Sequence, residues 1–76
     1  MKRTVHAFVS RGENRFVATC HEIHVVTQGQ TLDEAVDNLR EAVDLFFEDE
    51  DLSELGFAEN PVLLVSFEVE PLRHAG

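Results

Sequence analysis

One amphipathic helix lies between segments that alternate as strands do, and this pattern constrains the fold of the 76-residue chain most strongly. The helix begins with a capping box, in which we expect the Thr31 hydroxyl to bond the Glu34 amide while the Glu34 carboxylate reaches back. Apolar residues then recur at helical spacing as one stripe: Leu32, Ala35, Val36, Leu39, Ala42, Val43 and Phe46. A single stripe must be buried against another element, so we expect the strands to form a sheet beneath it.

The flanking segments predict four strands. Residues 4–10 and 15–20 alternate around a turn at 11–14, which predicts a β-hairpin. β-Branched residues at 25–27 predict a short third strand closed by Gly29. Residues 52–56 predict a short helical turn ended by Gly56, and alternation over 62–70, between Pro61 and Pro71, predicts the last strand. We expect a frayed tail at 72–76.

The expected architecture is therefore a single two-layer α+β domain over residues 1–76, with three antiparallel strands, one helix and then a fourth strand. One helix covers only one face of such a sheet. Phe8, Val17 and Val62 or Leu64 are expected on the uncovered face. An exposed apolar face of this kind favours a homodimer or higher homo-oligomer.

The charge balance excludes several classes of partner. Fifteen acidic residues against six basic ones give a net charge of −9. Such a surface repels phosphate backbones and anionic membranes, so we expect no direct nucleic-acid binding and no membrane binding. A small basic protein is the expected partner.

Cysteine usage bears on the compartment. Cys20 is the one cysteine, so no internal disulfide can form, and reducing cytoplasm is the expected location. The chain opens directly with an alternating segment, which is not typical of a signal peptide.

Cys20, His21 and His24 form the densest group of potential metal ligands. They match no strong zinc pattern, and a buried Cys20 among polar loop histidines is the favoured interpretation. Cys20 and His21 are adjacent on a strand and point to opposite faces, which disfavours a nucleophilic pair. Glu22 is the one carboxylate of an otherwise uncharged loop. We expect no catalytic residue and no cofactor, and hence no enzyme.

The acidic run Glu48, Asp49, Glu50 and Asp51 follows the helical stripe, where a helix dipole favours cations instead. Exposed acidic runs are most often solvated surface. If this run has a role, contact with a basic protein is the expected one. Phe47, beside Phe46 of the stripe, belongs either to the core or to that contact as an apolar anchor. We name Phe47 and the four carboxylates as the candidate partner-binding residues.

Residues 15–47 resemble the N-terminal domain of HicB-type antitoxins. That family shows an aromatic-x-Ala-x-Cys-Pro-Glu-Leu-Pro-Gly strand, then Thr-Gln-Gly, and then Thr-Leu-Glu-Glu-Ala and Asn-x-x-Glu-Ala on a helix. The matching residues here are Phe16, Ala18, Cys20, Glu22, Ile23, Thr27, Gln28, Gly29, Thr31, Leu32, Glu34, Ala35, Asn38, Glu41 and Ala42.

The resemblance implies a partial ribonuclease-H-like fold without nuclease chemistry. It also implies a protein that binds a small HicA-type toxin ribonuclease and occludes its catalytic histidine. The chain departs from the family where His21–Val25 replaces the Pro-x-x-Pro-Gly loop. Many family members also continue into a DNA-binding domain, which we do not expect here, so operator binding is not carried over.

Three functions follow as hypotheses. The first is a stand-alone antitoxin-like module that neutralises a HicA-type toxin. The second is an orphan HicB-like dimeric scaffold or regulator without a toxin, which the altered loop favours. The third is a metal-binding protein that uses Cys20, His21 and His24.

Overall fold

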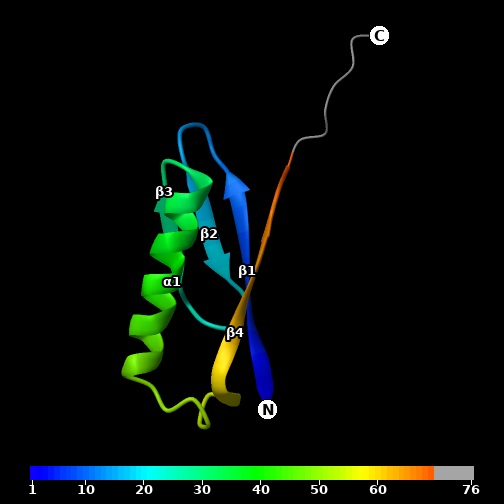
Figure 1. Cartoon of the computed structure of the whole chain (residues 1–76), viewed down its shortest axis with the longest axis vertical. Coiled ribbons are helices and arrows are strands. Elements are labelled where there is room, and N and C mark those ends of the chain that lie inside the picture. The colour runs from blue at the N-terminus through cyan, green and yellow to red at the C-terminus, as the bar shows by residue number, and fades with distance from the viewer. Residues whose placement is uncertain (70–76) are drawn as a thin grey trace.

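The computed structural model describes residues 1–69 and confirms the two-layer α+β architecture (Figure 1). In chain order its elements are β1 (Lys2–Arg11), β2 (Phe16–Cys20), β3 (Val26–Gly29), α1 (Leu32–Glu48) and β4 (Phe57–Phe67). The hairpin and the helix lie where the sequence predicts them. The expected frayed tail at 72–76, together with Glu70 and Pro71, lies outside the described residues.

The sheet has the strand order β3-β2-β1-β4. β2 pairs antiparallel with both β1 and β3, whereas β4 runs parallel to β1. The helix packs chiefly on β3 and β2, so it lies to one side of the sheet, while β4 forms the opposite edge (Figure 1). This off-centre position leaves the β4 side of the inner face only partly covered.

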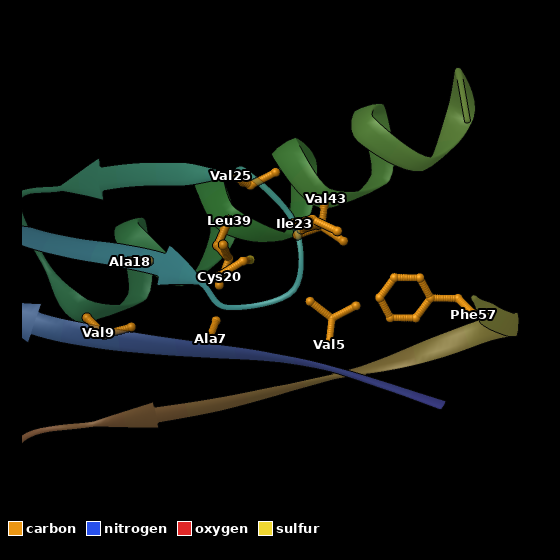
Figure 2. Close-up of a cluster of buried hydrophobic side chains, with 10 residues drawn as sticks. All are labelled: Val5, Ala7, Val9, Ala18, Cys20, Ile23, Val25, Leu39, Val43 and Phe57. Carbon is orange, nitrogen blue, oxygen red and sulfur yellow. The ribbon is translucent and has the colours of Figure 1, made fainter. Parts of the chain in front are cut away.

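The core forms between α1 and the inner face of the sheet (Figure 2). Val5, Ala7 and Val9 alternate along β1 and are each at most 3% exposed, as the two-residue period predicts. Its other buried apolar members are Ala18, Cys20, Ile23, Val25, Ala35, Leu39, Val43 and Phe57. Ile23 and Val25 lie in the loop before β3, and Phe57 is the first residue of β4. The sequence pattern did not assign these three residues to the core.

The helix start follows the capping box with one difference. The Thr31 hydroxyl accepts a hydrogen bond from the Glu34 amide at 3.0 Å, as expected. The Glu34 carboxylate accepts from the Gln30 amide at 3.2 Å, one residue before the expected partner. Both bonds satisfy backbone donors that would otherwise lack partners at the helix start.

Side chains also join β3 to α1 directly. The Thr27 hydroxyl donates to the Ala35 carbonyl at 3.3 Å, and the Asn38 amide donates to the Gln28 carbonyl at 2.8 Å. These bonds fix the distance and the register between the edge strand and the helix. They lie in the segment that carries the resemblance to HicB-type domains.

Gly29 closes β3, as the sequence predicts, and is the last residue of the strand, paired with Phe16. It is buried against the first turn of α1. A Cβ atom at this position would lie 2.8 Å from the Glu34 carbonyl carbon and 2.9 Å from Ala35 Cα. Because those neighbours are backbone atoms, no side chain fits between strand and helix here.

The last strand begins earlier than predicted. β4 starts at Phe57, and Pro61 lies inside it rather than before it. The register with β1 shifts between Lys2, which pairs with Phe57, and Thr4, which pairs with Val62. Asn60 has a φ of 53° within this bulge. An edge strand tolerates Pro61 because its missing amide is not needed by a second neighbour, and β4 ends at Phe67.

The helix of the described chain lacks the length and apolarity that crossing a membrane requires.

We expect Gly29→Ala to lower the free energy of unfolding by about 2 kcal/mol or more, because the added methyl group overlaps the α1 backbone. Gly12→Ala, in the hairpin turn, is the matched control and should cost about 1 kcal/mol or less, because its added methyl group would lie 3.3 Å from the Arg15 carbonyl oxygen, a much milder contact. Urea unfolding followed by circular dichroism measures both. Equal midpoints for the two variants would contradict the close approach of β3 and α1.

Candidate functional site

An open-sided groove runs between α1 and β4, because the helix is centred over the other side of the sheet. Its first hollow, of about 570 Å³, is lined by Arg40, Val43, Asp44, Phe47, Glu48, Leu52, Asn60, Pro61 and Leu63. Its second hollow, of about 510 Å³ near the helix start, is lined by Leu32, Asp33, Val36, Asp37, Val65 and Phe67. We call these two hollows together the α1–β4 groove.

The floor of this groove is apolar. Leu63 and Val65 of β4 are partly buried against the core, as are Leu32 and Val36 of α1. Phe67 remains 49% exposed at the far end. A groove that stays open along its length suits a segment of another protein better than a small molecule, which is usually enclosed on most of its surface.

The helix side of the groove carries its charge. The lining includes the exposed carboxylates of Asp33, Asp37, Asp44 and Glu48. Arg40 is the basic residue among them, and it lies 4.0 Å from Asp37 with both side chains over 70% exposed. Such an exposed pair contributes little to stability. The rim is therefore negative over an apolar floor.

The predicted acidic run is divided by the structure. Glu48 ends α1 and lines the α1–β4 groove, whereas Asp49 is the C-cap residue whose backbone amide donates to the Phe47 carbonyl. Glu50 and Asp51 line a separate hollow on the other side of Phe47, together with Met1, Leu52, Ser53, Phe57 and Glu59. The four carboxylates thus do not form one patch.

Asp51 has a local structural role. Its carboxylate accepts hydrogen bonds from the Ser53 hydroxyl at 2.7 Å and from the Ser53 amide at 3.0 Å. These bonds lower the pKa of Asp51. The Leu55 amide donates to the Asp51 carbonyl, and Gly56 ends the turn with a φ of 84°. The expected short helical turn at 52–56 is therefore a hydrogen-bonded turn that Asp51 begins.

Phe47 lies between the α1–β4 groove, which Glu48 lines, and the separate hollow that Glu50 and Asp51 line. It is partly buried, and its ring makes edge-on contacts with Phe46 at 5.6 Å and with Phe57 at 5.5 Å between centroids. It therefore packs against the core while one side of the ring lines the α1–β4 groove. The two interpretations that the sequence left open for Phe47 are compatible.

The three potential metal ligands do not converge. Cys20 is buried in the core, whereas His21 and His24 are exposed. Within residues 1–69, no group of three or more His, Cys, Asp or Glu side chains is placed to hold a metal ion. Burial, and then the negative charge of Glu22, raise the pKa of the Cys20 thiol.

A carboxylate–imidazole pair that the sequence did not predict joins Glu22 to His6. Glu22 accepts from the His6 amide at 2.8 Å, and its other oxygen lies 2.7 Å from His6 Nδ1. At the point where β2 ends beside β1, the Glu22 carboxylate thus accepts the hydrogen bond that the His6 amide would otherwise donate to a neighbouring strand. Burial raises the pKa of Glu22, but the His6 hydrogen bonds and charge outweigh it, and the resulting pKa lies below the ordinary value. The unusual position of Glu22 in an uncharged loop was the available signal.

Comparison with protein-family models finds no match to this chain, and neither do comparisons with curated proteins and with solved structures. The resemblance to HicB-type domains therefore rests on the sequence motif alone. In the structure, several of the motif residues act on the fold itself: Glu22, Thr27, Gly29, Thr31, Glu34 and Asn38. None of these six lines the α1–β4 groove.

We expect the Cys20 thiol to react with a disulfide reagent at least about tenfold more slowly in the native protein than in urea, because burial and Glu22 disfavour the reactive thiolate. Absorbance of the released thiol anion follows the reaction at constant pH. Native labelling as fast as that of the unfolded chain would contradict the buried position.

We expect Glu22→Gln to lower the free energy of unfolding by about 1 kcal/mol near pH 7, through loss of charge-assisted hydrogen bonds. Because the folded pKa of Glu22 lies below the unfolded value, this stabilisation is present above the unfolded pKa. It is lost as pH falls through the folded pKa. Denaturant unfolding between pH 7 and pH 3 should therefore show the difference between the two proteins at neutral pH and its loss below the ordinary carboxyl pKa. Glu13→Gln, on the exposed hairpin turn, is the control and should match wild type throughout.

Proposed function

We propose that this protein is an antitoxin-like binding module that neutralises a small basic toxin ribonuclease of the HicA type. The observation that carries the proposal is the α1–β4 groove, with its apolar floor and its negative rim. The motif resemblance of residues 15–47 to HicB-type domains supports the choice of toxin class.

The two parts of the groove have separate roles in this proposal. Leu63, Val65 and the exposed side of Phe47 offer apolar surface whose burial would supply affinity. The rim carboxylates attract a cationic protein over several ångströms and raise the association rate, an effect that salt screens. A basic segment with one apolar side fits both features.

Glu48 and Phe47 are the two candidate residues that lie in the groove, and we propose them as the central partner contacts. Glu50 lies in the adjoining hollow, so it would contact a partner that extends past Phe47. Asp49 caps the helix through its backbone, and Asp51 holds the following turn. We propose that these two carboxylates add to the negative electrostatic potential that attracts the partner and do not contact it directly.

The proposal assigns no reaction to the protein. The Cys20 thiol is buried, and His6 of the Glu22 pair points to the sheet face away from α1. Inhibition would follow from covering the toxin's catalytic histidine, as the resemblance implies. A cytoplasmic location, where such a toxin cleaves RNA, belongs to the same proposal.

We expect Glu48→Lys to weaken binding of a purified HicA-type toxin from the same cell by about tenfold, because a rim carboxylate becomes a cation that faces a basic partner. The affinity should also become less dependent on salt. Titration calorimetry at low and at moderate ionic strength measures both effects. Glu13→Lys makes the same change of net charge at the hairpin turn, where the residue lines neither hollow of the groove, and should bind as wild type does.

Equal weakening by the two variants would contradict a contact in the groove and would leave only an effect of net charge. If no toxin from the source cell binds the wild-type protein, the antitoxin proposal fails. The hypothesis of an orphan scaffold would then take its place.

A further inference from the structure

The sheet face that points away from α1 is unusually apolar for an uncovered surface. We call it the outer face. Strand register places Phe8 beside Thr19 and Ser66, and it places Val26 on the other side of Thr19. Leu64 pairs with His6, and Val62 pairs with Thr4. Because paired residues point to the same side of a sheet, these side chains form one continuous surface.

The apolar members of the outer face are open to solvent in the single chain. Phe8 is 39% exposed, Leu64 is 51% exposed, and both Val26 and Val62 exceed 60%. They come from β1, β4 and β3, so the apolar surface extends across the sheet rather than along one strand. Contiguous apolar surface of this kind marks an interaction site.

The outer face also lacks the charge that covers the rest of the molecule. The chain carries a net charge of −9. Yet none of the outward positions in the paired registers of the described strands is an acidic residue, from Thr4 to Ser10 of β1 and across to Ser66 of β4. Two carboxylates border this region: Glu22 is bound to His6 of β1, and the exposed Glu68 follows β4, with its backbone amide donating to the Val9 carbonyl. By contrast, α1 and the groove present carboxylates along their length.

We propose that the outer face binds a second copy of this chain, so that two sheets pack face to face about a twofold axis. A second copy carries the same charge, and like charges oppose its approach everywhere that carboxylates face one another. The outer face is the described surface where two copies can meet with the least of that repulsion, because no paired outward position carries an acid. Its paired strand positions offer no carboxylate to attract a basic partner, which belongs instead at the groove.

The size of the face sets the expected strength. Four strands about 4.8 Å apart, with about six residues each rising about 3.3 Å, give a projected area of roughly 400 Å². A stable interface usually buries about 800 Å² of accessible surface on each partner. We therefore expect a weak dimer that forms at micromolar concentration and dissociates on dilution. Because α1 lies on the other side of the sheet, the dimer would leave both grooves open, and the inference does not depend on the proposed function.

The test places a charge at Thr19, which is exposed, central on the outer face and next to Phe8 in register. Sedimentation equilibrium should show that wild type dimerises, whereas Thr19→Glu and Thr19→Lys each raise the dissociation constant at least tenfold. An equimolar mixture of the two variants should recover dimers, because opposite charges then meet across the axis. Raising the salt concentration should strengthen the wild-type dimer, since it screens the net repulsion.

Gln30→Glu adds the same charge on an exposed loop and is the matched control, which should dimerise as wild type does. Circular dichroism and thermal unfolding establish that the Thr19 variants are folded. A wild-type chain that stays monomeric at several hundred micromolar overturns the proposal. So does a dimer that both Thr19 variants leave unchanged, which would point to pairing through the free edge of β4.

Discussion

The close approach of β3 to the first turn of α1 is the constraint on which the rest of the structure depends. Gly29 permits it because no side chain separates the strand from the Glu34 and Ala35 backbone. The Thr27 and Asn38 hydrogen bonds then hold the helix at that distance and in that register. With one end of the helix tied to an edge strand, α1 must lie over β3 and β2.

Both candidate binding surfaces follow from that position. A helix centred on the sheet would cover Leu63 and Val65, but a helix held at the β3 edge leaves a groove beside β4. The molecule has no second helix in the described residues to cover the outer face. The charges divide along the same lines, with carboxylates along α1 and the groove, and neutral side chains outward from the sheet. The distribution of charge over the surface therefore says more about where this protein can bind partners than the net charge does.

The structural roles of the motif residues explain what a motif of this kind can and cannot predict. Thr31 and Glu34 cap the helix, and Gly29, which has no side chain, allows the helix backbone to pack closely against β3. Glu22 ends the β1–β2 ladder by bonding the His6 amide. Residues with these roles specify how strand, loop and helix join. The groove is lined by other positions, so the resemblance predicts the fold more directly than it predicts the partner.

The sequence by itself determined the hairpin, the helix with its cap, and the faces of β1 and α1. Each depends on local periodicity or on hydrogen bonds between residues close in the chain. It did not determine the early start of β4, the burial of Phe57 or the Glu22–His6 pair. Pro61 suggested a boundary, and only the edge position of β4 makes a proline acceptable inside a strand. Likewise, the acidic run 48–51 is continuous in sequence, but α1 ends within it and a turn begins at Asp51. Glu48 therefore lines the α1–β4 groove, whereas Glu50 and Asp51 line a separate hollow. Such features depend on contacts between distant residues, which only the tertiary structure decides.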